Sequence, residues 1–240
     1  QLRGDVYARN DANSGRGNDT LISPKLNLAY RMASSVELYA NWGEGFHSND
    51  VRGATIRLDP VSGEPVDSVA PLVKSDGGEV GARIEFGDAF NVTVTHFLLN
   101  LDSELVFVGD AGGTEPNPAT RRVGTEIAGF WQVNDWLAAN LNLTKVDAKF
   151  RNEEGSGREI PGAVETVASL GLNAAWENRL FASMRARFLG EAPLVEDGSV
   201  SSDDSLLLNA SIGYRREHVE LRLDAFNLLD SDDDDIAYYY

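Results

Sequence analysis

The sequence predicts an all-β protein whose strands form an antiparallel, up-and-down sheet of the kind that closes into a transmembrane barrel. Apolar and polar residues alternate along successive strand-like runs. Most of these runs are about 9 to 14 residues long, which is enough to cross a bilayer at a tilt. The runs are joined alternately by tight turns and by long polar connections. Short turns at one edge of a sheet and long loops at the other are typical of outer-membrane barrels.

The strand-like runs divide into an apolar and a polar set, because successive side chains of a strand point to opposite faces. From Glu79 to Phe86 the even positions are apolar, whereas the odd positions include Glu79, Arg83 and Glu85. From Val219 to Ala225 every residue of the polar set is charged. Similar divisions occur in Lys25–Arg31, Val36–Trp42, Leu137–Thr144 and Leu180–Phe188. Charged faces of this kind favour a barrel wall with one side toward lipid.

Roughly eleven complete runs are expected, followed by a truncated one at Ile236–Tyr240. The longest, from Phe90 to Phe107, would extend well beyond the membrane. Aromatic residues near the ends of runs suit the two interfacial girdles of a barrel. These residues are Tyr30, Trp42, Trp131, Trp136, Trp176 and Tyr214.

The two kinds of connection alternate almost to the end of the chain. Tight turns are predicted near Ala33–Ser35, Gly87–Asp88, Asn134–Asp135, Glu177–Asn178 and Arg216–Glu217. Long connections are predicted near Asp11–Asn18, Phe46–Val73, Val108–Ala119, Arg151–Gly162 and Glu191–Asp203. This order places the long connections on the extracellular side and the tight turns on the periplasmic side. A water-soluble β-sandwich remains an alternative, because it also alternates apolar and polar residues.

Composition and the absence of long apolar runs exclude several classes of protein. The formal charge of −17 argues against a nucleic-acid partner, because such a protein needs clustered Lys and Arg to displace phosphate counterions. No apolar run is long enough for a transmembrane helix, which leaves transmembrane strands possible. The N-terminus has neither the basic nor the apolar region of a signal peptide, and both ends fall inside strand-like segments, so a fragment is expected.

Catalysis, a metal centre and a cofactor are not expected. The chain has no cysteine, and its sequence contains neither a Gly-x-Ser-x-Gly elbow nor a His-Glu-x-x-His motif. The carboxylates of Asp230–Asp235 could attract a divalent cation, but they lack the ordered spacing and the glycine of an EF-hand loop. A solvated loop is the simpler interpretation of this segment.

Two groups of residues are candidates for a functional role. The first begins the longest connection and combines aromatic, imidazole, amide, carboxylate and guanidinium groups, which suit a polar ligand or an iron chelate; it comprises Phe46, His47, Asn49, Asp50 and Arg52. The second would line a lumen, and possible roles there are the retention of a plug or simple solvation; it comprises Glu37, Arg83, Glu85, Glu126, Arg185, Arg187, Glu220, Arg222 and Asp224.

Six short segments resemble, in order, motifs of the TonB-dependent outer-membrane receptors. Ser23-Pro-Lys-Leu26 resembles a recurring strand opening of that family, and Val36–Phe46 resembles its "YA.YG.GF" strand. The others are similar to its "K...E.G" strand, its "G.E" strand, its "IPGAP" turn and its late "V.NLFD" strand; they are Val73–Ala82, Arg122–Glu126, Ile160–Ala163 and Leu223–Asp230.

The resemblance implies a barrel of about 22 strands that encloses an N-terminal plug domain. Residues 1–240 would form the C-terminal portion of this barrel, about 11 to 12 strands, without the plug. The implied function is active import of a scarce solute across the outer membrane of a Gram-negative bacterium, energised by the TonB complex through the plug. A ferric siderophore or another metal chelate is the expected cargo, and cobalamin or an oligosaccharide stays open. A passive porin or a structural barrel is the alternative within the membrane.

Overall fold

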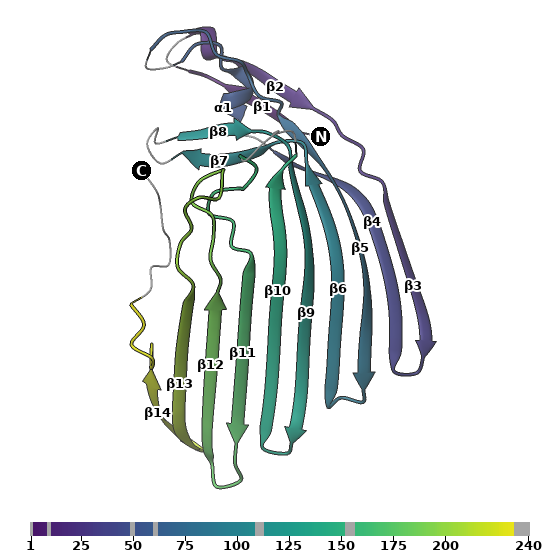
Figure 1. Cartoon of the computed structure of the whole chain (residues 1–240), viewed down its shortest axis with the longest axis vertical. Helices are drawn as coiled ribbons and strands as arrows, with labels where there is room; N and C mark the ends of the chain where they lie inside the picture. Colours follow the sequence, from purple (N-terminus) through teal and green to yellow (C-terminus); the bar gives the residue numbers. More distant parts are fainter. Residues whose placement is uncertain are drawn as a thin grey trace. The chain divides into compact units, whose positions relative to one another are not determined.

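The computed structural model describes residues 2–8, 11–48, 51–59, 62–108, 113–151 and 157–232. Almost all of its regular structure is β-strand (Figure 1). Ten strands form one sheet in the order β14-β13-β12-β11-β10-β9-β6-β5-β4-β3. The all-β, up-and-down sheet predicted from the sequence is therefore confirmed, and its end strands β3 and β14 leave the barrel unclosed.

The strands of this sheet run from 7 residues in β14 to 15 in β5 and β9, so most of them are long enough to cross a bilayer. They are β3 (Lys25–Ala33), β4 (Val36–Ser48), β5 (Leu72–Phe86), β6 (Phe90–Leu101), β9 (Thr120–Asn134), β10 (Leu137–Phe150), β11 (Thr166–Ala175), β12 (Leu180–Leu189), β13 (Ser205–Arg216) and β14 (Val219–Ala225).

Two small sheets and a short helix complete the fold. Strand β1 (Leu2–Val6) pairs with β2 (Gly15–Asp19), and β7 (Glu104–Val108) pairs with β8 (Gly113–Asn117). A 3₁₀ turn at Asp11–Asn13 precedes β2, and helix α1 (Val51–Thr55) follows β4. The chain divides into two compact units: unit 1 comprises Gln1–Leu26, Asn41–Gly78 and Leu99–Arg121, and unit 2 comprises Asn27–Ala40, Glu79–Leu98 and Arg122–Tyr240.

The tight turns of the sheet all belong to unit 2 and lie at one end of it (Figure 1). They coincide with the five predicted turns. Local side chains close them: Asn134 Oδ1 accepts hydrogen bonds from the backbone N–H groups of Trp136 and Leu137, at 3.0 and 2.9 Å. Gly87 has a φ of 57°, a left-handed conformation that glycine adopts without strain. The indole rings of Trp136 and Trp176, from two of the turns, stack with centroids 5.6 Å apart.

Three predictions about the runs and their connections are wrong. The expected long connection Val108–Ala119 contains the whole of β8. The expected run from Phe90 to Phe107 is divided at Asp102 and Ser103, and its second part is β7, which pairs with β8 outside the main sheet. The three consecutive polar residues Asp102–Glu104 interrupt the alternation at the break, but Leu99, Leu101, Leu105 and Phe107 keep one period-two series on both sides of it. The expected loop Asp11–Asn18 contains most of β2, whose polar, glycine-rich sequence does not look like a strand. The truncated run at Ile236–Tyr240 lies outside the described residues.

The register of β12 and β13 defines two faces of the sheet in unit 2. We call one the apolar face; it carries Leu180, Ala182, Met184, Ala186 and Phe188 beside Tyr214, Ile212, Ala210, Leu208 and Leu206. We call the other the polar face; it carries Ser183, Arg185 and Arg187 beside Ser211, Asn209 and Leu207. From Leu180 to Phe188 the apolar face extends over eight residue steps, about 26 Å along the strand. This length approaches the apolar band of about 25 Å in outer-membrane barrels.

The apolar face is exposed. Leu223 is 69% exposed, Leu221 is 66% exposed and Ile212 is 52% exposed. Few of the described hydrophobic residues are buried, and the cluster of Ala148, Phe150 and Ile160 lies at the C-terminal end of β10. Such an arrangement is opposite to that of a soluble β-sandwich, whose apolar faces pack against each other. No helix among the described residues is long and apolar enough to span a membrane.

Candidate functional site

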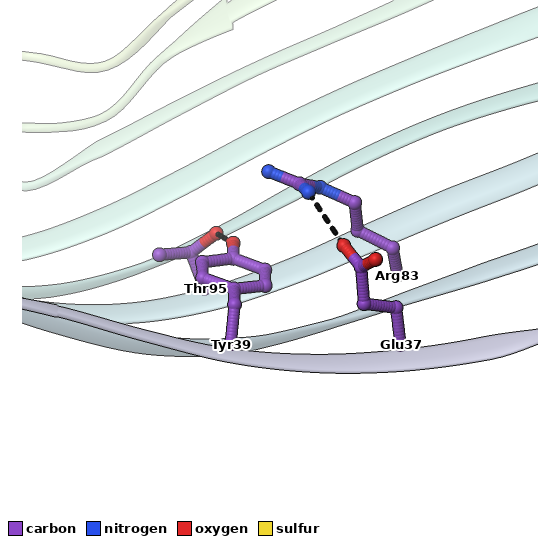
Figure 2. A network of polar contacts seen from close by, with 4 residues as sticks. All are labelled: Glu37, Tyr39, Arg83 and Thr95. Carbon is purple, nitrogen blue, oxygen red and sulfur yellow. Dashed lines mark hydrogen bonds and ion pairs between the residues drawn. The ribbon is translucent and has the colours of Figure 1, made fainter. Parts of the chain in front are cut away.

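A network of four residues lies on the polar face of strands β4, β5 and β6 (Figure 2). Arg83 Nη1 donates a 2.8 Å hydrogen bond to Glu37 Oε1, and the guanidinium carbon of Arg83 lies 4.6 Å from the centroid of the Tyr39 ring. The hydroxyl oxygens of Tyr39 and Thr95 lie 2.5 Å apart. The structure therefore brings together Glu37 and Arg83, two of the predicted wall residues, and adds Tyr39 and Thr95, which sequence reasoning missed.

The hydroxyl end of the Tyr39 ring lies over Gly81 on β5, where a Cβ atom would overlap it. The same arrangement recurs around the sheet, since Phe97 covers Gly124 and Phe181 covers Gly213. Glycine in a strand interior often marks such a close approach. These glycines are thus required by the large side chains beside them, and they let those side chains lie along the wall.

Ion pairs also occupy the polar face near the β13–β14 turn. Arg215 Nε donates a 2.7 Å hydrogen bond to Glu220 Oε2, and its guanidinium lies 5.0 Å from the centroid of the Phe181 ring. Arg222 pairs with Asp224 on its own strand, at 2.6 Å. Three of the predicted wall residues, Glu220, Arg222 and Asp224, therefore have partners of opposite charge.

The remaining predicted wall residues lie on the same face without forming one cluster. Arg185 is opposite Asn209 in the register, and Arg187 is opposite Leu207. Glu85 lines a small pocket of about 120 Å³ beside the β3–β4 turn, together with Arg31, Glu37 and Arg83. Glu126 shares a strand face with Gly124, two residues away.

The predicted ligand-binding residues lie at the start of the β4–β5 connection. Phe46 and His47 are near the C-terminal end of β4, away from the β3–β4 turn, and Arg52 belongs to α1. Phe46 is 47% exposed, whereas the His47 Nε2 atom is buried and has no hydrogen-bond partner among the described residues. The other two candidates, Asn49 and Asp50, lie outside the described residues.

The rest of this connection has internal order. Leu58 and Pro65 form an antiparallel bridge, and the N–H group of Val66 donates a 3.0 Å hydrogen bond to the carbonyl oxygen of Arg57. At the tip, Asp59 Oδ1 accepts hydrogen bonds from the backbone N–H and the hydroxyl of Ser62, at 2.6 and 3.1 Å. The connection therefore contains a small hairpin from Arg57 to Val66.

Unit 2 contains an acidic cavity of about 590 Å³ between its two long connections. The carboxylate-bearing residues of its lining are Glu159, Glu165, Glu191, Asp197 and Asp204. A hydrogen bond from Ser199 lowers the pKa of Asp197 below its ordinary value. Sequence reasoning missed this cavity, because its lining comes from two connections about 30 residues apart. Within the described ranges, no group of three or more His, Cys, Asp or Glu residues is arranged to hold a metal ion.

The predicted acidic segment is only partly described. Asp230 has a φ of 52° and follows Asn227, whose Oδ1 accepts a 3.0 Å hydrogen bond from the N–H group of Ser231. The segment thus begins as a turn. Its last three residues, 233–235, lie outside the described part of the chain.

The long strands, the exposed apolar face and the charged polar face together define the wall of a large β-barrel. A family model described as "TonB dependent receptor-like, beta-barrel" matches residues 1–228. The chain therefore belongs to the TonB-dependent receptor β-barrel family, as its sequence motifs predicted. The family is one of outer-membrane receptors rather than enzymes.

Solved structures with the same fold come from several receptors. The ferric yersiniabactin uptake receptor FyuA from Yersinia pestis is 16% identical, with a TM-score of 0.73 over 90% of this chain and 33% of that one. The closed form of the ferric-catecholate import receptor Fiu from E. coli K12 is 17% identical, with a TM-score of 0.73 over 91% of this chain and 32% of that one. The copper transporter OprC is 18% identical, with a TM-score of 0.71 over 92% of this chain and 36% of that one. The present chain thus spans about a third of their length.

Proposed function

We propose that residues 1–240 form the C-terminal portion of the barrel of an outer-membrane active-transport receptor in a Gram-negative bacterium. The observation that carries this proposal is the family match over residues 1–228, together with a sheet that exposes an apolar face on one side and charged residues on the other. Outer-membrane lipid would cover the apolar face. The polar face would line the lumen and contact an N-terminal plug domain.

The cargo that we propose is a ferric siderophore or another metal chelate. Two of the similar structures are named for ferric chelates and one for copper. Phe46, His47, Asn49, Asp50 and Arg52 would contribute to the ligand surface on the extracellular side. The TonB complex would act on the plug and open a path along the polar face, where Glu37, Arg83, Glu85, Glu126, Arg185, Arg187, Glu220 and Arg222 lie.

Uptake by a deletion strain tests the proposal. Cells that lack the full-length gene, and matched cells that lack TonB, would be given radioactive iron(III) as a tris-catecholate complex and, separately, as a hydroxamate complex. We expect both deletions to abolish uptake of the same complex and plasmid-borne full-length protein to restore it. Uptake that depends on the gene but not on TonB would indicate a passive porin. Uptake of every iron complex at the wild-type rate in the gene deletion would contradict the proposed cargo.

A further inference from the structure

Asn13 joins the N-terminal hairpin to the β4–β5 connection, although 44 or more residues separate them in sequence. Its Nδ2 donates a 2.8 Å hydrogen bond to the carbonyl oxygen of Leu58. Its Oδ1 accepts hydrogen bonds from the backbone N–H groups of Arg57 and Leu58, each at 2.9 Å. One amide side chain therefore satisfies three backbone groups of the connection.

The position of these bonds matters because Arg57 and Leu58 form the base of the small hairpin in that connection. Arg57 is bonded to Val66, and Leu58 is bridged to Pro65. Asn13 is only 9% exposed, so its hydrogen bonds compete little with water. Loss of the Asn13 side chain would leave two N–H groups and one carbonyl without their partner, which is costly where water has poor access.

A second contact fixes the helical part of the same connection. Helix α1 lies against β1 and β2, and the side chain of Thr55 lies so close to Gly15 of β2 that a Cβ atom there would meet it at 3.5 Å. Thr55 is 9% exposed, and its hydroxyl donates a 3.3 Å hydrogen bond to the carbonyl oxygen of Arg52. The N–H group of Val69 bonds to the carbonyl oxygen of Gly53 at 3.0 Å. The connection is thus held to the N-terminal hairpin on both sides of Arg57.

We infer that Asn13 is a positioning residue that orders the β4–β5 connection before any ligand arrives. The connection carries Arg52 and follows Phe46 and His47, so its order fixes the ligand surface named above; in this respect the inference rests on the proposed function. A preformed surface binds without the entropy cost of ordering a loop, which is otherwise added to the cost of association. Asn13 itself need not touch the ligand.

The test compares variants of the full-length protein in detergent micelles. Asn13→Ala removes all three hydrogen bonds, whereas Asn13→Asp keeps the two acceptor bonds and loses the bond to the Leu58 carbonyl. Asn18→Ala is the matched control, because Asn18 is an exposed residue of the same hairpin. Electrophoretic mobility without boiling reports whether each variant is folded. Hydrogen exchange is then measured at residues 51–59, and the affinity for iron(III) tris-catecholate is measured by tryptophan quenching.

We expect the amides of Arg57 and Leu58 to exchange at least about tenfold faster in Asn13→Ala, with a smaller increase in Asn13→Asp and none in Asn18→Ala. The dissociation constant for iron(III) tris-catecholate should likewise rise most in Asn13→Ala, less in Asn13→Asp and not at all in Asn18→Ala. Unchanged exchange in folded Asn13→Ala would overturn the inference, and so would faster exchange with an unchanged dissociation constant. If the wild-type protein did not bind tris-catecholate iron, the proposed cargo would be contradicted, and the exchange rates alone would decide whether Asn13 orders the connection.

Discussion

Arg83 on β5 donates a 2.8 Å hydrogen bond to the carboxylate of Glu37 on β4, which ties two neighbouring strands together on the polar face of the sheet. The side chains are 48% and 27% exposed, so water and salt screen the pair. An ion pair of this kind contributes little to stability but presents a fixed arrangement of charges. The pair is therefore expected to contribute little to the stability of the sheet.

Replacement of either partner tests this expectation. We expect Glu37→Gln and Arg83→Gln to lower the free energy of unfolding of the full-length protein only slightly, and the double-mutant cycle to give a coupling of about 0.2–1 kcal/mol. Urea titration in low salt and in about 1 M salt would measure it, and the coupling should disappear at high salt. A coupling above about 2 kcal/mol would show that the pair is shielded from water by another part of the protein.

The contact between Tyr39 and Gly81 predicts a much larger effect. Gly81→Ala would place a methyl group inside the space of the Tyr39 ring and against the backbone of Val94. We expect a loss of about 1–3 kcal/mol in the free energy of unfolding, as for other overpacked sites. Gly129→Ala is the control, because a Cβ atom there would meet its nearest neighbour, Val92 Cγ2, at 3.7 Å. Equal urea midpoints for the two variants would contradict the prediction.

Sequence and structure agree where the information is local. Alternation within one strand assigned Arg83 and Glu85 to one face and Ile84 to the other, because the side-chain period of a strand is fixed. Glycine and asparagine likewise located the turns at Gly87 and Asn134, because they stabilise turn geometry. These features need no knowledge of which strand lies beside which.

Sequence reasoning missed features that depend on register. Tyr39 covers Gly81 only because β4 and β5 pair in one of many possible alignments, and Asn13 reaches Leu58 only through the fold of unit 1. An asparagine in a polar segment gives no sign that it will form hydrogen bonds with a distant stretch of backbone. The break after Leu101 was missed although the polar residues Asp102–Glu104 mark it, because the apolar residues on either side keep the same period.

Adjacent residues on β11 test which face meets lipid. Leu172 pairs with Met184 in the middle of the apolar face, whereas Asn173 pairs with Ser183 on the polar face. We expect Leu172→Arg to lower the free energy of unfolding in vesicles by about 2–4 kcal/mol, the cost of arginine near the bilayer midplane. Asn173→Arg, one residue along the same strand, should cost far less because its side chain reaches water. The reverse order would exclude lipid contact by the apolar face.

The β1–β2 hairpin should weaken in acid. Arg16 Nε donates a 2.7 Å hydrogen bond to Asp5 Oδ1, and this bond holds the pKa of Asp5 below its ordinary value of 3.8. Because the pKa is lower in the folded state, the contribution of the pair to stability is present above about pH 4 and is lost as the pH falls through the lowered value. The test is the hydrogen-exchange rate of residues 2–6 in Asp5→Asn divided by the rate in the wild type, measured at each pH. This ratio should be greater than one at pH 6. The ratio should approach one near pH 2, where the wild-type carboxyl is protonated, and a ratio that does not change with pH would exclude Asp5 as the titrating group.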